Sequence, residues 1–332
     1  MIIDAYTHIL PMAYKKAVIS KVPRLFPPLS TLWDTLKTLT DVNLRLDIMD
    51  EYGIDMHGLA AAAPPIETLF QDRTIAKEMA RLQNDSLAEI VQAHPNRFFG
   101  IATVSMLDPD DAVEEVTRCV KELGFAGVQI YSNVAGRPID DPRYEIFYDT
   151  VEQLNIPVWL HPNRTAKQAD YEGEDESKYL LWQVLGWPYE TSIAMARLVF
   201  SGIMQRHPDL KVICHHAGAM IPFFSNRIKL LYPKTESMTE SEFAPGVSKP
   251  YIDHFKRFYV DTVVQGNVSS LLNAMDFFGA DHMIFASDMP FDIEMGREFT
   301  RVSLESVSQL PVSDAIKSDI HSLNLKRICP IR

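Results

Sequence analysis

Short runs of apolar residues, many of them β-branched, alternate along this chain with longer segments in which apolar positions recur every three or four residues. The short runs are typical of buried strands, and the longer pattern is typical of helices with one face on a core. Their alternation predicts βα units joined into a parallel sheet. The runs lie at residues 1–8, 53–61, 98–104, 126–131, 156–161, 210–216, 258–262 and 283–288. Eight strands predict an α/β protein with the closed (β/α)8 fold of the TIM barrel.

The segments between the runs carry helical signals. Apolar residues recur at three-and-four spacing from Ala76 to Val91, just before the third run. Carboxylates open the segment that begins at Asp110 and reaches Leu123, and Gly124 follows it, as expected for a helix with favourable charges at its start and a glycine at its end.

Two stretches do not fit the alternation of strands and helices. Residues 10–39 contain four prolines, and residues 163–189 contain a group of carboxylates near their middle. Each follows a strand whose end carries polar side chains suited to chemistry. We therefore expect two insertions over the mouth of a site, within a single domain that spans residues 1–332.

Composition narrows the class of protein. The length of 332 residues fits one barrel, for which about 250 residues plus insertions is typical. The 44 acidic residues outnumber 32 Lys and Arg, and the net charge of −12 argues against a nucleic-acid or membrane partner. Three cysteines without CxxC spacing suit a reducing compartment. Because we see no leader and no apolar run near 18 residues, we expect a cytoplasmic protein.

Four of the eight runs end in side chains that can bind a metal or transfer a proton. A single His beside a Tyr is more often structural, but the carboxyl ends of barrel strands converge on one face, where active sites are built. A set of two His and one Asp with an open position is typical of a catalytic divalent metal. The side chains concerned are Tyr6, His8, His161, His215, His216 and Asp288. His57, on the second run, is assigned neither to the site nor to the core.

Several motifs together resemble a known superfamily. They are Asp4-Ala5-Tyr6-Thr7-His8, Leu160-His161-Pro162, the stretch from His216 to Phe223 and the stretch from Phe285 to Phe291. In this order they resemble the amidohydrolase superfamily. Within it the chain is most similar to the branch of aminocarboxymuconate-semialdehyde decarboxylase and γ-resorcylate decarboxylase, and the similarity spans nearly the whole chain.

The resemblance implies a set of site residues. His8, His161 and Asp288 would bind one divalent metal ion, zinc in the first place and manganese as the alternative. His216 would act as a general acid/base, with Asp288 as a second candidate for delivering a proton.

The resemblance also implies how a substrate carboxylate is held. Arg227 matches an arginine that family dimers present to the neighbouring subunit, so we expect a homodimer or a higher homo-oligomer. Arg45 matches a second arginine of this kind. The fixed fork of guanidinium donors suits bidentate binding of a carboxylate.

Tyr6 departs from the family pattern, which has His or Glu at this position. A phenol with an ordinary pKa near 10 is a poor neutral ligand. Tyr6 would therefore either ionise against the cation or stand off, next to substrate or a metal-bound water. Strand alternation predicts that the side chain of His215 points away from that of His216, and we interpret His215 as structural.

Three functions are compatible with these residues. The leading hypothesis is a metal-dependent, non-oxidative decarboxylase of a small aromatic or unsaturated carboxylic acid, that is, a carboxy-lyase with a small anionic substrate. The second is a hydrolase or hydratase on the same scaffold, acting on a lactone, an amide or an enol acid. The third is an inactive, metal-poor member that serves as a binding partner, which only Tyr6 supports.

Overall fold

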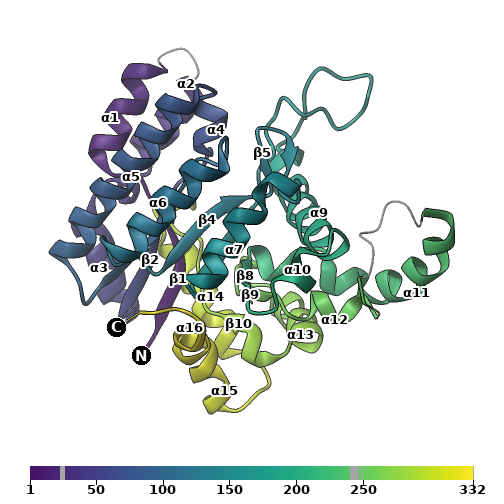
Figure 1. Cartoon of the computed structure of the whole chain (residues 1–332). Coiled ribbons are helices and arrows are strands. Elements are labelled where there is room, and N and C mark those ends of the chain that lie inside the picture. Colours follow the sequence, from purple (N-terminus) through teal and green to yellow (C-terminus); the bar gives the residue numbers. More distant parts are fainter. Residues whose placement is uncertain (23–26, 240–246, 249, 332) are drawn as a thin grey trace.

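Eight parallel strands stand side by side in chain order around the centre of the molecule (Figure 1). The structure is a computed structural model that describes residues 1–22, 27–239, 247–248 and 250–331. The strands are β1 (Ile3–Ile9), β2 (Met56–Ala61), β3 (Phe98–Thr103), β4 (Gly127–Tyr131), β7 (Pro157–His161), β8 (Lys211–Cys214), β9 (Tyr259–Asp261) and β10 (Met283–Ile284). Each of the eight predicted runs overlaps one of them.

Backbone hydrogen bonds join the first strand to the last strand segment. Ala5 N donates to Phe285 O at 2.9 Å, His8 N donates to Met289 O at 2.9 Å, and Asp288 N donates to Tyr6 O at 3.2 Å. The ends of the sheet therefore meet, and the prediction of a TIM barrel is confirmed.

The strands are buried on both faces, as parallel sheets flanked by helices are. One face packs into a cluster inside the barrel that includes Ile3, Trp159 and Ile213. The other face packs against the helices through a larger cluster that includes Leu59 and Val128. Two continuous apolar layers thus hold the strand ends in place.

Helices cover the outside of the sheet (Figure 1). Those named by the prediction are found, as α5 (Arg73–Ala93) and α6 (Pro109–Lys121), and Asp110 and Asp111 lie in the first turn of α6. The others are α1 (Met12–Lys21), α2 (Pro27–Thr35), α3 (Val42–Tyr52), α4 (Ile66–Leu69), α7 (Glu145–Gln153), α8 (Leu181–Val184), α9 (Gly186–Phe200), α10 (Ile203–Arg206), α11 (Ile221–Thr239), α12 (Ile252–Phe255), α13 (Val268–Phe278), α14 (Arg297–Ser308), α15 (Asp314–Ser318) and α16 (Asn324–Ile328). None of the described helices is long and apolar enough to cross a membrane.

The two unusual stretches contain no strand of the barrel in their described residues. The stretch 10–39, of which residues 23–26 lie outside the described part, forms α1, α2 and a 3₁₀ turn at Lys37–Leu39. Its buried Tyr14 and Trp33 share an apolar cluster with Phe70. The stretch 163–189 is mostly irregular and ends with α8 and the start of α9.

A small hairpin after β4 was not predicted. It pairs β5 (Asn133–Val134) with β6 (Arg137–Pro138) through a turn in which Ala135 and Gly136 have φ of 49° and 84°. Two-residue strands are too short to show a hydrophobic period, so the pattern that revealed the barrel strands does not reveal this hairpin.

Candidate metal centre

Four side chains from the ends of four strands converge. His8 lies in β1, His161 ends β7, His215 directly follows β8, and Asp288 follows β10. One nitrogen each from His8, His161 and His215 lie within 4.8 Å of one another. His8 Nε2 is 3.1 Å, and His215 Nε2 is 3.5 Å, from Oδ1 of Asp288. The structure therefore brings together all three predicted metal ligands, and adds His215.

The rings of the three histidines are fixed through their Nδ1 atoms. His8 Nδ1 lies 3.2 Å from the carbonyl oxygen of Ala61, and His161 Nδ1 lies 2.7 Å from that of Pro162. His215 Nδ1 bonds to the carboxylate of Asp261. These partners only accept hydrogen bonds, so Nδ1 carries a proton in each ring, and the lone pair of the neutral ring is on Nε2.

The donor set fits a divalent metal ion. The buried Nε2 atoms of His8 and His215 have no well-aligned hydrogen bond among the described residues, and their polar contact is with the carboxylate of Asp288, so a cation could lie between these groups. Imidazole and carboxylate are ligands of zinc, and adjacent tetrahedral ligands at about 2.1 Å from one ion are roughly 3.4 Å apart. The distances of 3.1 and 3.5 Å from Asp288 Oδ1 to the Nε2 atoms of His8 and His215 are close to this value.

The charges of the cluster also favour a cation. Burial acts to raise the pKa of Asp288, but His215 and His8 outweigh it and hold that pKa well below its usual range. Burial acts to lower the pKa of His215, but the carboxylates of Asp261 and Asp288 raise it to about 10. The two carboxylates thus create a field that stabilises positive charge at this place.

His216 lies beside the cluster rather than behind it. Its ring centroid is 3.7 Å from that of His215, and its Nδ1 is buried without a hydrogen-bond partner among the described residues. Burial first, and then His215, lower the pKa of His216 well below its usual value. His216 is therefore a neutral imidazole at the edge of the site.

The expectation that the side chain of His215 points away from that of His216 is wrong, because their ring centroids are 3.7 Å apart. The strand ends at Cys214, and the chain then turns at His216, which has φ of 57°. The alternation of side chains holds only within extended backbone, so it does not apply to these two residues.

The side chain of Tyr6 is hydrogen-bonded to a residue of β4. Its ring centroid is 5.0 Å from that of His8 and 4.9 Å from that of His215. Its hydroxyl donates to Oε1 of Gln129 at 2.7 Å, and Gln129 Nε2 donates to Tyr131 Oη at 2.9 Å. Burial raises the pKa of Tyr6 well above its usual value. Tyr6 is therefore a neutral phenol whose proton is held by Gln129.

Arg45 does not present its guanidinium to a ligand as expected. The side chain is fully buried, and its NH2 group donates to the carbonyl oxygen of His8 and, at 3.2 Å, to that of Thr38. Its NH1 donates to Thr7 Oγ1 at 3.1 Å. Arg45 therefore stabilises the backbone that carries His8, and we correct its role from substrate binding to positioning.

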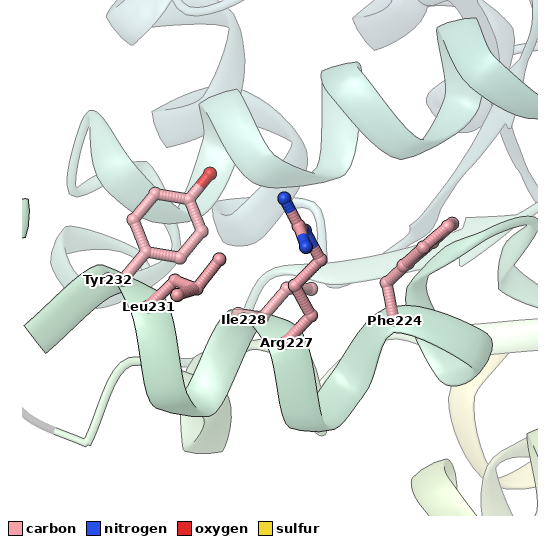
Figure 2. Close-up of a pocket in the computed structure, with 5 residues that line it drawn as sticks. All are labelled: Phe224, Arg227, Ile228, Leu231 and Tyr232. Carbon is pink, nitrogen blue, oxygen red and sulfur yellow. The ribbon is translucent and has the colours of Figure 1, made fainter.

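Arg227 lies outside the histidine cluster of its own chain. It is an exposed residue of α11, a helix that extends away from the barrel (Figure 1). Figure 2 shows its side chain rising from α11 between Phe224 and Tyr232, where these residues line a cavity of about 340 Å³ together with Ile228 and Leu231.

A buried polar network lies below the metal centre. Asp4 accepts hydrogen bonds from Ser287 N at 3.0 Å and from Ser287 Oγ, and His57 Nε2 lies 3.9 Å from its carboxylate. Burial first, and then the charge of Arg45, lower the pKa of His57 well below its usual value. His57 is therefore a neutral residue of the core.

Sequence reasoning missed Asp261 and Gln129. Asp261 ends β9, and the rule that selected the other strand ends would have found it. Gln129 lies within β4, and its amide gave no signal of its own. Aromatic rings complete the site: the centroids of Tyr131 and Trp187 are 5.2 and 5.4 Å from that of His161, and Phe291 is 5.3 Å from His8.

Comparisons with known proteins agree with this geometry. Residues 3–328 match the family described as Amidohydrolase. γ-Resorcylate decarboxylase from Polaromonas sp. (strain JS666) is 34% identical over 271 residues, which cover 78% of this chain and 81% of that protein.

Two solved structures are similar over almost the whole chain. A 2,6-dihydroxybenzoate decarboxylase in complex with 2,6-dihydroxybenzoate has a TM-score of 0.82 at 28% identity and covers 98% of both chains. A dihydroxybenzoic acid decarboxylase from Polaromonas sp. JS666, with bound manganese and the inhibitor 2-nitroresorcinol, has a TM-score of 0.81 at 28% identity and covers 98% of this chain and 96% of that one. Both are decarboxylases of aromatic acids.

Proposed function

The chain belongs to the amidohydrolase family, and from this premise we propose that it is a metal-dependent, non-oxidative decarboxylase of a small hydroxylated aromatic acid. The observation that carries the proposal is the convergence of His8, His161 and Asp288 at the carboxyl ends of β1, β7 and β10. Those ends are where barrel enzymes build their active sites. The relatives and the solved structures supply the reaction class.

The metal would be held by His8, His161 and Asp288. A divalent ion bound there would polarise and anchor an oxygen of the substrate, either of its carboxylate or of a neighbouring hydroxyl group. Neutral imidazole and carboxylate are compatible with both zinc and manganese. We propose manganese ahead of zinc, because the Polaromonas structure was solved with bound manganese.

The surrounding side chains suit an aromatic ring. Tyr131 and Trp187 lie against His161, and Phe291 lies against His8, so aromatic surfaces border the cluster on two sides. Aromatic side chains favour offset or edge-to-face contacts with another ring. A benzoate-like substrate would therefore find apolar contacts for its ring next to charged groups for its carboxylate.

Decarboxylation leaves a ring carbon that must gain a proton. The carboxylate carbon departs as carbon dioxide, and its bonding electron pair stays on the ring until that proton arrives. His216 and Asp288 are both beside the cluster, and the pKa of each lies below its usual value, so neither carries an extra proton at neutral pH. We propose that one of them first accepts a proton, from a substrate hydroxyl group or from water, and then delivers it to the ring carbon.

Arg227 would serve a second copy of the chain. On α11, Phe223 and Leu230 expose 77% and 59% of their surfaces, and Arg227 lies on the same helix. Exposed apolar side chains around a cation fit a subunit interface better than a solvated surface. We propose a homodimer in which Arg227 reaches the substrate carboxylate in the partner's site.

Carbon dioxide release tests the proposed function. Purified protein loaded with manganese(II), or separately with zinc(II), is supplied with 2,6-dihydroxybenzoate and other hydroxybenzoates, and released carbon dioxide is measured. We expect release with at least one acid, and its loss in His216→Gln.

His94→Gln is the matched control, because His94 lies at the end of α5, before β3 and away from the strand ends that carry the cluster. The control should keep wild-type rates. Metal-loaded protein that releases no carbon dioxide from any of these acids would contradict the proposal.

A further inference from the structure

We propose that His215 is a fourth protein ligand of the metal, held in place by Asp261. The inference rests on the proposed function, since it concerns the same metal centre, and it changes the ligand set from two imidazoles to three. His215 Nε2 lies 3.5 Å from Asp288 Oδ1, and one of its nitrogens lies within 4.8 Å of the ligand atoms of His8 and His161. Nε2 of His215 is buried and, apart from this contact with Asp288, has no hydrogen-bond partner among the described residues.

Asp261 is built to orient His215. Its Oδ1 accepts hydrogen bonds from the backbone N–H groups of Ala217 and Val263, each at 3.1 Å. The carboxylate is thereby fixed, and its Oδ2 bonds to Nδ1 of His215. A carboxylate on the far nitrogen of an imidazole is a common support for a metal-binding histidine, because it sets the tautomer and the direction of the free lone pair.

The two neighbouring candidates for an additional ligand lack such support. His216 forms a second possible metal-binding group with His215 and Asp288, but its Nδ1 has no hydrogen-bond partner among the described residues, so no hydrogen bond fixes the orientation of its ring. The hydroxyl of Tyr6 donates to Gln129 at 2.7 Å and is therefore already committed. His215 thus supplies the ligand that the family pattern places at the position of Tyr6.

A consequence concerns the proton chemistry. With His215 on the metal, its neighbour His216 is left as the free imidazole of the pair. The two adjacent histidines then have separate tasks, in which one binds the metal and the other exchanges protons with substrate.

Metal binding without substrate tests this inference. Metal-free protein is titrated with manganese(II) alone and with zinc(II) alone, for wild type, His215→Gln, Asp261→Asn and His216→Gln. We expect Asp261→Asn to weaken binding roughly 10- to 100-fold, the usual effect of losing such a support, and His215→Gln to weaken it at least as much. His216→Gln is the matched control and should bind both metals as wild type does.

The number of imidazoles on the metal separates a ligand from a residue that only positions others. X-ray absorption of the zinc-loaded protein should show three imidazoles in wild type and in His216→Gln, and two in His215→Gln. A count of two imidazoles on the metal in wild type would overturn the inference. This test uses the wild-type protein alone, so it remains valid even if His215→Gln does not fold. If folded His215→Gln kept three imidazoles on the metal, or bound the metal as tightly as wild type, the inference would be overturned as well. Because carbon dioxide release by wild type is a separate measurement, failure of the proposed function would be recognised independently.

Discussion

Nε2 of His8 lies 3.1 Å from Oδ1 of Asp288, although 279 residues stand between them in the chain. The backbone explains this approach, because Asp288 N donates to Tyr6 O at 3.2 Å and His8 N donates to Met289 O at 2.9 Å. The seam that closes the barrel therefore also joins two of the proposed metal ligands.

Replacing His161 should remove the metal. His161→Ala deletes an imidazole whose Nδ1 is fixed by the carbonyl of Pro162 and whose other nitrogen faces the cluster. We expect loss of stoichiometric metal and of decarboxylation together, measured by elemental analysis and carbon dioxide release. One metal ion per chain in the dialysed variant would show that the ligand assignment is wrong.

Tyr6→Phe should affect stability more than metal binding. The change leaves the buried Oε1 of Gln129 without its donor, and an unsatisfied buried acceptor costs about 1–3 kcal/mol. We expect that loss in the free energy of unfolding by urea, with metal affinity unchanged. A double-mutant cycle with Gln129→Leu should reveal coupling between the two side chains. A large drop in metal affinity in Tyr6→Phe would instead identify the phenol as a ligand.

Asp4 should make the stability of the metal-free protein depend on pH. Burial raises the pKa of Asp4 from 3.8 to about 7, against the hydrogen bonds from Ser287 that act to lower it. The folded protein binds this proton more tightly than the unfolded chain does. The contribution of Asp4 to the free energy of unfolding is therefore complete below about pH 4 and is lost as the pH rises through 7.

Asp4→Asn removes this titration. The stability of wild type relative to Asp4→Asn should fall between about pH 4 and pH 8, by at most about 4 kcal/mol at 1.36 kcal/mol per pKa unit. Urea unfolding of both metal-free proteins across this range measures the difference. If the difference in unfolding free energy between the two proteins did not change with pH, the raised pKa of Asp4 would be contradicted.

Arg227→Ala should weaken substrate binding while leaving the metal in place. Losing one partner of a buried, hydrogen-bonded charge pair costs roughly 2–5 kcal/mol, and we expect a rise in substrate Kd of that size. Metal content, measured in parallel, should equal that of wild type.

Mixed subunits test whether Arg227 acts across an interface. Arg227→Ala chains are mixed with His161→Ala chains, and we expect each variant to be nearly inactive alone. If Arg227 serves the partner's site, a mixed dimer contains one site with both residues intact, and activity should return. No return of activity after confirmed subunit exchange would rule out this arrangement.

The sequence predicted the barrel well because each strand is a short apolar run between helical segments. It also selected His8, His161 and Asp288, since strand ends meet on one face in any such barrel. It failed at His215, because the backbone leaves the extended conformation at the next residue, His216. The position of a side chain in a turn depends on dihedral angles such as the φ of 57° at His216, which a hydrophobic pattern does not encode.

The sequence also could not show which residues contact one another in the folded protein. Arg45 carries the same charge whether it faces a ligand or a carbonyl group, and only the structure shows that it donates to His8 O and Thr38 O. Asp261 likewise becomes informative through its bond to His215, which lies 46 residues away in the chain.

The seam between β1 and the segment after β10 sets an order for biosynthesis. His8 is made well before Asp288, because β1 precedes β10 and the segment after it in the chain. A nascent chain that ends before β10 has the histidines but not the carboxylate that faces two of them. We therefore expect tight metal binding only after Asp288 has been made, and an ion retained through dialysis would report that the barrel has closed.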